Sequence, residues 1–232
     1  EMQSNGLAIS DPASGYDRTN PYSGRDPRLQ QTVIVNGSNW KGQTVESFIG
    51  GANGRPITNA TKTGYYLKKY VIEAINLSPT NTTNREHTWV LFRYGEVLLN
   101  YAEAMNEAYG PENGAGFGLT ALDAVNQIRQ RANMPNYPAG LSQSGFRDKL
   151  RNERMVELAF EDHRFWDIRR WKIGQQTTNI FQMEISTNSS NNGFVFDKKL
   201  LEVRPYEERM NIYPIPQAEL FKNENLTQNT GW

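Results

Sequence analysis

Hydrophobic residues recur at helical spacing in the middle of the chain. Between residues 88 and 109 they fall three or four positions apart, which is the spacing of an amphipathic helix, and Gly110-Pro111 ends it. Thr120 suits the N-cap of a second helix that runs through Ala132. The small residues Ala102 and Ala124 mark where two antiparallel helices can approach.

This predicted helix pair, residues 88–133, has about the length of a tetratricopeptide (TPR) unit, and no second copy follows at that period. A single repeat cannot bury both of its faces. Either further repeats lie outside this chain, or the loops and the next helix cover the pair.

The segment 142–172 predicts a helical, highly charged region. A third helix is expected from Ser142 or Ser144 to about Phe160, and a shorter one from His163 to about Lys172, with Asp162 at the break.

Within the charged segment, acids and arginines are interleaved with large aromatic residues, so some charges must lie against apolar surface. A buried ion needs a partner, because leaving it unpaired costs several kcal/mol, of order 3–5. We expect structural ion pairs between the acids Glu153, Glu157, Glu161 and Asp167 and the arginines Arg151, Arg154, Arg164, Arg169 and Arg170 at helical spacing.

The rest of the chain is rich in turn-forming residues. Residues 1–87 show little periodicity, and only Thr32–Val35 and Tyr70–Ile72 favour short strands. Residues 173–232 predict a β-hairpin between Phe181 and Arg204, turning near Ser189–Gly193, and then a polar tail.

Aromatic side chains in the loops of residues 1–87 are candidates for ligand binding. They lie among Asn, Arg, Gly and Ser instead of on a periodic apolar face, and flat rings beside polar donors suit sugars. The same rings could simply pin long loops to the helices. Trp40 is the strongest candidate because Asn39 and Lys41 flank it; the full set is Tyr16, Tyr22, Asn39, Trp40, Phe48, Arg55 and Tyr65.

Composition narrows the possible functions. With 25 basic and 25 acidic residues the net charge is zero, which argues against nucleic acid or an anionic membrane as the main partner. The chain has no cysteine and two histidines, so neither a cysteine metal site nor a catalytic triad is expected, and no cofactor is predicted. The sequence opens at Glu1 in polar loop-like sequence, and we expect a piece of a longer protein.

Three catalytic or metal interpretations compete with structural ones. Glu153 and Glu157 could form a glycosidase acid pair, but ion pairing explains them better. His163 could be a general base, although a hydrogen-bonded histidine at a helix start is favoured. Asp11 and Asp17 lack the spacing of a calcium loop, and turn chemistry explains them.

Six segments, in order, resemble the C-terminal half of the SusD/RagB family, the nutrient-binding outer-membrane lipoproteins of Bacteroidetes. The segments are Arg25–Leu29 (RDPRL), Thr63–Lys69 (TGYYLKK), Phe92–Ala104 (FRYGEVLLNYAEA), Ile128–Ala132 (IRQRA), Glu153–Trp171, and Tyr213–Pro216 (YPIP) followed by Asn225–Asn229 (NLTQN). Departures are Gly95 for the usual alanine, Asn133 and Asp162 for glycines, and Thr230 for proline. Asn and Asp tolerate left-handed backbone geometry best among non-glycine residues.

The resemblance implies a mainly α, TPR-like superhelical fold with long irregular loops. It also implies surface capture of glycans or other nutrients without chemistry, above a TonB-dependent, SusC-like porin. The lipid anchor would lie in an N-terminal half absent from this sequence. A helical adaptor that binds only the porin, or a glycoside hydrolase using Glu153 or Glu157, are the alternatives.

Overall fold

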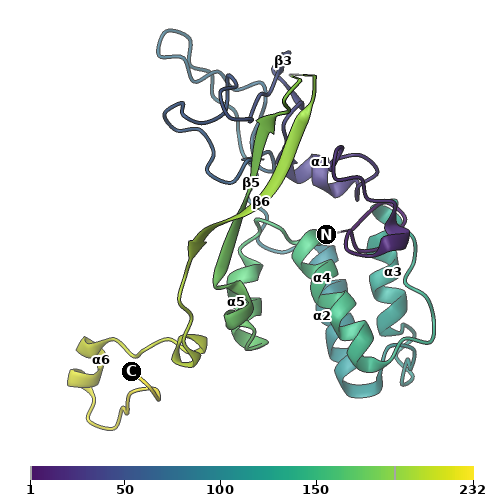
Figure 1. The fold of residues 1–232 in the computed structure, drawn as a ribbon. Helices are drawn as coiled ribbons and strands as arrows, with labels where there is room; N and C mark the ends of the chain where they lie inside the picture. Colours follow the sequence, from purple (N-terminus) through teal and green to yellow (C-terminus); the bar gives the residue numbers. More distant parts are fainter. Residues whose placement is uncertain (1, 191) are drawn as a thin grey trace.

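The computed structural model describes residues 2–190 and 192–232, and its regular structure is mainly helical with three small two-stranded sheets. This confirms the predicted fold class. The main helices are α2 (Tyr94–Tyr109), α3 (Ala121–Arg131) and α4 (Gln143–Glu157). Figure 1 shows them side by side, with a long hairpin rising beside them and loop-rich segments around the hairpin.

The main hydrophobic core lies between α2, α3 and α4. Ala102 and Ala124 are completely buried, which confirms their expected place between two closely packed helices. The other buried core residues are Leu98, Leu99, Met105, Ala121, Val125, Ile128, Tyr137, Phe146, Leu150 and Leu158.

The helix α4 covers the α2–α3 pair on one side only. On the other side of α2, Tyr94 is 67% exposed and Val97 is 53% exposed. The solitary repeat therefore buries one face against its own third helix and presents apolar side chains on the other.

Two helix boundaries differ from the sequence prediction. The first helix starts at Tyr94 instead of residue 88, because Arg93 has extended backbone (φ −145°) and turns its guanidinium toward α4. Val90 is consequently 39% exposed and is not part of a helix face. The third helix ends at Glu157, and Phe160 has a left-handed backbone (φ 62°) and is 53% exposed.

The remaining helix predictions agree with the structure. Asp162 (φ 62°) separates α4 from α5 (His163–Arg170), and Asn133 (φ 55°) follows α3; both adopt the left-handed backbone geometry that the sequence predicts for them. Short helical segments elsewhere are η1 (Pro12–Ser14), α1 (Arg28–Thr32), η2 (Gly174–Thr177), η3 (Glu208–Asn211) and α6 (Gln217–Lys222).

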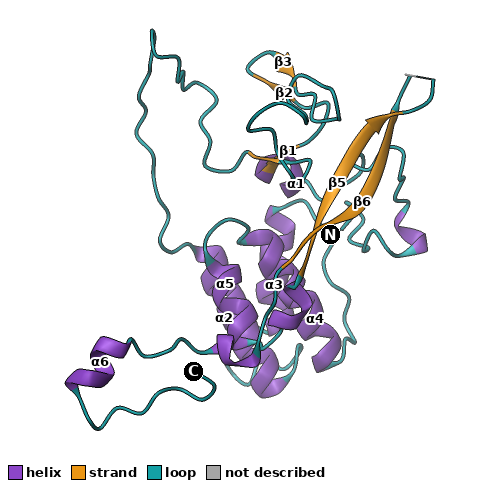
Figure 2. Cartoon of the chain, turned by 60° about the vertical axis from the view of Figure 1, so that its left-hand side comes forward, coloured by secondary structure: helices purple, strands orange, loops and turns teal. Residues whose placement is uncertain are grey.

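The predicted hairpin is formed by β5 (Asn179–Thr187) and β6 (Phe194–Val203), antiparallel, with a bulge between Ile180 and Phe181. Asn191 of the predicted turn lies outside the described residues. Figure 2 shows the hairpin rising from the helices toward the upper right of the view, and α6 with the C-terminal tail extending away from the helices.

Two further sheets organise the loops. β1 (Val33–Ile34) pairs with β4 (Tyr66–Leu67), and β2 (Asn39–Trp40) pairs with β3 (Gln43–Thr44). The strand predicted at Tyr70–Ile72 is wrong: Tyr70 has a left-handed backbone (φ 66°), which ends strand pairing there. Among the described residues, no helix combines the length and apolar character that crossing a membrane requires.

The N-cap of α3 provides a direct test of this local structure. Thr120 Oγ1 accepts from the Asp123 amide at 3.0 Å, and the Asp123 carboxylate accepts in return from the Thr120 amide at 3.1 Å. We expect Thr120→Ala to lower the free energy of unfolding by about 1 kcal/mol. Urea denaturation measures it, with Thr120→Ser as the control that keeps the cap; equal stability of the Ala and Ser variants would contradict the assignment.

Candidate functional site

Two buried carboxylates on α4, Glu153 and Glu157, lie one helical turn apart. Glu153 is completely buried. Its Oε1 accepts from Arg28 Nη1 at 2.7 Å, and its Oε2 accepts from Arg129 Nη1 at 2.6 Å and from the Tyr137 hydroxyl at 3.1 Å. Both oxygens of this carboxylate are therefore fully engaged by groups from α1, α3 and the loop after α3.

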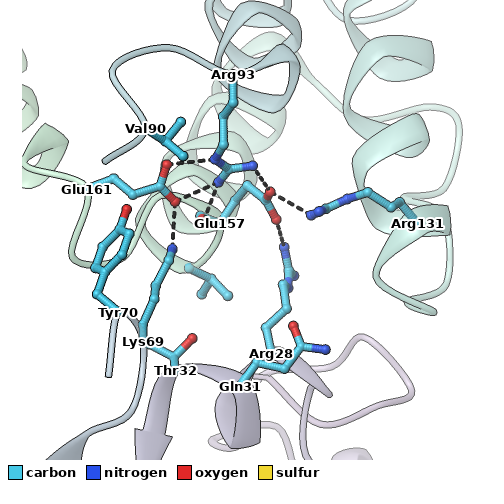
Figure 3. A pocket seen from close by; sticks show the side chains of 11 residues that line it. Arg28, Gln31, Thr32, Lys69, Tyr70, Val90, Arg93, Arg131, Glu157 and Glu161 are labelled. Atoms are coloured by element: carbon cyan, nitrogen blue, oxygen red, sulfur yellow. Dashed lines mark hydrogen bonds and ion pairs between the residues drawn. The ribbon is translucent and has the colours of Figure 1, made fainter. Parts of the chain in front are cut away.

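Glu157 receives three arginines from three different segments. Arg28 donates to it at 2.9 Å, Arg93 at 2.5 Å and Arg131 at 2.6 Å. Figure 3 shows these side chains converging on the Glu157 carboxylate, with Arg93 also bridging to Glu161. We call the set Arg28, Arg93, Arg129, Arg131, Glu153, Glu157 and Glu161 the ion-pair cluster.

Burial and pairing act in opposite directions on these groups. Burial by itself would raise the pKa of Glu157, but hydrogen bonds from Arg93 and Arg28 outweigh it and hold that pKa below its ordinary value. Burial would likewise lower the pKa of Arg28, but its hydrogen bond to Asp26 and the charge of Glu153 raise it. Glu157 and Arg28 are thus both held in their ionised forms at neutral pH.

The ion-pair cluster borders a hollow of about 350 Å³ whose lining also includes Gln31, Lys69 and Tyr70 (Figure 3). Lys69 Nζ donates to Glu161 at 2.6 Å and to the Ala159 carbonyl at 2.9 Å. The charged side chains that line this hollow are already paired with one another. We therefore assign them a structural role and not a role in ligand binding.

Gly95 is explained by the same cluster. A Cβ at position 95 would lie 2.7 Å from Arg93 Nη1 and 3.3 Å from Glu157 Oε1. The glycine therefore leaves room for the Arg93–Glu157 pair, at the expected helix cost of about 1 kcal/mol.

The predicted partners of the acids are only partly correct. Asp167 does pair within its own segment, with Arg154 at 2.8 Å and Arg170 at 2.9 Å. Glu153, Glu157 and Glu161 instead bind cations from distant segments. Arg151 and Arg169 lie over the rings of Trp171 and Phe165. Helical spacing could not predict these partners. The acids face the core, whereas Arg151 and Arg169 lie against aromatic rings.

The histidine and aspartate alternatives have structural explanations. His163 Nε2 lies 3.5 Å from Glu96, at the start of α5, in agreement with the structural interpretation. Asp11 and Asp17 each accept a backbone amide two residues ahead, at 2.8 Å, which is turn chemistry.

Three of the predicted ligand residues, Tyr16, Tyr22 and Tyr65, lie together in one hollow of about 330 Å³. All three rings are half-buried. Tyr22 meets the Tyr65 ring edge-on at a centroid distance of 6.1 Å, and Arg25 lies 5.7 Å from the Tyr16 ring centroid. We call this the tyrosine hollow.

The other four predicted residues do not line the tyrosine hollow. Asn39 and Trp40 form β2, with Asn39 exposed and Trp40 half-buried. Phe48 packs against Phe194 of the hairpin at a centroid distance of 5.1 Å. Arg55 pairs with Glu184 of β5 at 3.3 Å.

The sequence analysis missed the hairpin's part in the tyrosine hollow. Phe181, Gln182 and Met183 of β5 and Lys198 of β6 line it, together with Ile9, Pro21 and Arg25. The alternation of the hairpin was recognisable, but nothing in the sequence indicated which of its faces the loops would cover.

In overall fold the chain is a helical bundle bearing a long hairpin and extended ordered loops, and proteins of known structure share it. A SusD-like protein from Bacteroides fragilis superposes with a TM-score of 0.78 at 28% identity, over 100% of this chain and 45% of its own. A SusD-like carbohydrate binding protein of the same species gives 0.70 at 26% identity, over 97% and 46% of the two chains.

Sequence comparison agrees. SusD-like protein P2 of Formosa agariphila is 33% identical over 173 residues, which cover 71% of this chain and 29% of that protein. The SusD family model matches residues 5–232. The chain therefore belongs to the SusD family, and it spans less than half the length of these relatives.

Removal of a cluster carboxylate should be costly. Glu153→Ala leaves Arg129, 1% exposed, without a carboxylate partner, and Glu157→Ala removes a shared acceptor of three arginines. We expect each to lower the free energy of unfolding by about 3–5 kcal/mol in urea denaturation. The control is Glu107→Ala, which breaks an exposed pair with Arg147 and should cost about 0.5 kcal/mol. A Glu157→Ala protein as stable as the Glu107→Ala protein would contradict the proposed role of the cluster.

Acid should weaken the same interactions. The pKa values of Glu157 and Glu161 are lowered because hydrogen bonds from cations outweigh burial, so their stabilisation is complete above the ordinary value of 4.5 and is lost as pH falls below it. We expect the urea midpoint to hold between pH 7 and 5.5 and to drop between pH 4.5 and 3. The Glu157→Ala variant should show a smaller drop; an equal one would assign the acid sensitivity to other groups.

Proposed function

We propose that the protein binds glycans at the cell surface without catalysis and delivers them to a SusC-like, TonB-dependent porin. Membership of the SusD family supports this proposal, as does the similarity to a B. fragilis SusD-like carbohydrate binding protein. By the same family argument, the full protein is held at the outer face of the outer membrane by a lipid anchor.

The observation that carries the proposal is the tyrosine hollow. Tyr16, Tyr22 and Tyr65 present half-buried rings on its wall, and Phe181 adds a fourth ring from the hairpin. Sugars bind to such surfaces because their C–H faces pack on aromatic rings while their hydroxyl groups hydrogen-bond at the rim. Tyr16 and Tyr65, with Lys198, supply polar side chains of that kind on the lining.

The other predicted residues, Asn39, Trp40, Phe48 and Arg55, are proposed to extend the ligand surface of residues 1–87. Support is strongest for Trp40, whose ring is half-buried on a short exposed hairpin. It is weaker for Phe48 and Arg55, because both already contact the β5–β6 hairpin.

The hydrolase alternative finds no support in Glu153 and Glu157. A glycosidase acid needs a raised pKa and an open path to the substrate. Here pairing lowers the pKa of Glu157, and the two side chains are 0% and 2% exposed. Both carboxylates are occupied by arginines, which is a structural role.

Calorimetric titration with a panel of oligosaccharides tests the function on the full protein. We expect Tyr65→Ala and Tyr16→Ala each to weaken the binding of a recognised glycan about five- to tenfold, since stacking on one ring is worth about 1–1.5 kcal/mol. Tyr94→Ala is the matched control, because that tyrosine is 67% exposed on α2 and does not line the hollow.

The outcomes separate the rival functions. If no glycan in the panel binds while a SusC-like porin does, the protein is an adaptor and the proposed function is wrong. If glycan binding survives both tyrosine substitutions but fails in Trp40→Ala, the ligand lies at the β2–β3 hairpin and not in the tyrosine hollow.

A further inference from the structure

The hollow of about 350 Å³ beside the ion-pair cluster, which we call the cluster hollow, contains polar groups that the cluster does not use. Its charged groups are not among them. Each charged side chain on the described lining has an ion pair: Arg28, Arg93 and Arg131 bind Glu157, and Lys69 binds Glu161.

The neutral polar residues of the same lining are Gln31, Thr32 and Tyr70. Within the part of the chain that the structure describes, none of their side-chain nitrogen or oxygen atoms has a hydrogen-bond partner. Gln31 is exposed, whereas Thr32 and Tyr70 are half-buried. An amide offers donors and an acceptor, and each hydroxyl group offers both. The cluster hollow therefore combines paired charges with neutral donors and acceptors that a ligand can use.

Tyr70 gives the cluster hollow an aromatic side (Figure 3). The Trp89 ring stacks on the Tyr70 ring at a centroid distance of 5.2 Å, and the His87 ring meets it edge-on at 5.6 Å. The backbone of Tyr70 is left-handed (φ 66°), which is unfavourable for a bulky residue. Contacts with the two neighbouring rings thus hold the Tyr70 side chain in place before a ligand arrives, which reduces the entropy lost on binding.

The cluster hollow lies close to the tyrosine hollow. Tyr65 lines the tyrosine hollow and Tyr70 lines the cluster hollow, and a separation of five residues keeps their Cα atoms within about 18 Å. A smaller hollow of about 160 Å³ links the two, because its lining includes Arg25 of the tyrosine hollow and Arg28 of the cluster hollow. One oligosaccharide of several units can therefore contact both.

We infer that the cluster hollow is a second subsite for the glycan and that it takes a neutral sugar unit. The Tyr70 ring packs against the C–H groups of this unit, while the Gln31 amide and the Thr32 hydroxyl exchange hydrogen bonds with its hydroxyl groups. This inference rests on the proposed function and adds a second point of contact and the uncharged character of the unit held there.

The existing ion pairs select against a charged sugar. A carboxylate or sulfate group would lose its water beside Glu157 and Glu161, and the described lining has no unpaired cation to receive it. A neutral sugar instead replaces the water on the Gln31 amide with a hydrogen bond of the same kind, and its C–H groups gain the contact with the Tyr70 ring. Because the unit belongs to a chain already held in the tyrosine hollow, this contact adds affinity without a second loss of translational freedom.

Calorimetric titration of the full protein with a length series of a recognised oligosaccharide tests the inference. The probes are the shortest member that the parent protein binds and a member several units longer. We expect Gln31→Ala to weaken binding of the longer member about two- to tenfold, through the lost hydrogen bonds, and to leave binding of the shortest member unchanged. The matched control is Gln30→Ala, which removes the adjacent exposed amide of α1; Gln30 does not line the cluster hollow, so both affinities should be unchanged.

The outcomes separate this inference from the proposed function. Equal affinities of the Gln31→Ala and Gln30→Ala proteins for the longer member would overturn the second subsite and leave glycan binding in the tyrosine hollow intact. An equal loss for the shortest and the longer member in Gln31→Ala would also overturn it, because the substitution would then act on the tyrosine hollow. If no oligosaccharide binds the parent protein, the proposed function and the inference are both wrong.

Tyr70→Gly tests the ring separately from the fold. Glycine adopts the left-handed backbone at position 70 without strain, which offsets the ring contacts that the substitution removes. We expect an unchanged urea midpoint and about three- to tenfold weaker binding of the longer oligosaccharide. Unchanged binding of that oligosaccharide would overturn the role of Tyr70 in the subsite.

Discussion

The carboxylates of Glu153 and Glu157 are buried on α4, and their need for counter-ions constrains the rest of the chain. Arg28 reaches them from α1, Arg93 from the residue before α2, and Arg129 and Arg131 from α3. Each of these links joins segments far apart in sequence, so the helices and the first loops are held to one another by the same few charges. Because losing one partner leaves a buried ion uncompensated, the arrangement tolerates little change.

The ion pairs of Arg28 also position the tyrosine hollow, through α1 and the short strands that follow it. Arg28 fixes α1, which leads directly into β1, and β1 pairs with β4 at the Tyr66–Leu67 register, next to Tyr65. Backbone hydrogen bonds from Met183 to Thr63 and from Ile49 to Ile185 then attach the hairpin to the same loops. The rings are thus ordered before a ligand arrives, which reduces the entropy lost on binding.

Local chemistry in the sequence was sufficient for most of the helices and for the hairpin. The cap at Thr120, the left-handed Asn133 and Asp162, and the alternation of residues 181–204 all depend on neighbours within a few positions. Predictions that depend on distant residues did less well. The helix α2 begins later than predicted because Arg93 binds Glu157. The place of Lys198 on the lining of the tyrosine hollow could not be predicted without knowing how the hairpin packs on residues 1–87. The three tyrosines of the hollow stand out in the sequence because aromatic residues in polar loops have no helix face to occupy, and their role in ligand binding stays a prediction.

The segment Arg25–Arg28 joins the scaffold to the proposed ligand surface. Arg25 lines the tyrosine hollow, while Asp26 and Arg28 belong to the buried charges beneath it. A substitution in this segment is therefore expected to change the stability of the fold and the lining of the hollow together. Lys198, in contrast, is exposed at the hollow and takes no part in the ion-pair cluster. A substitution that changes the lining of the hollow without loss of the fold is therefore easier at the hairpin than at the arginine-rich segment, because the carboxylates of α4 then remain paired.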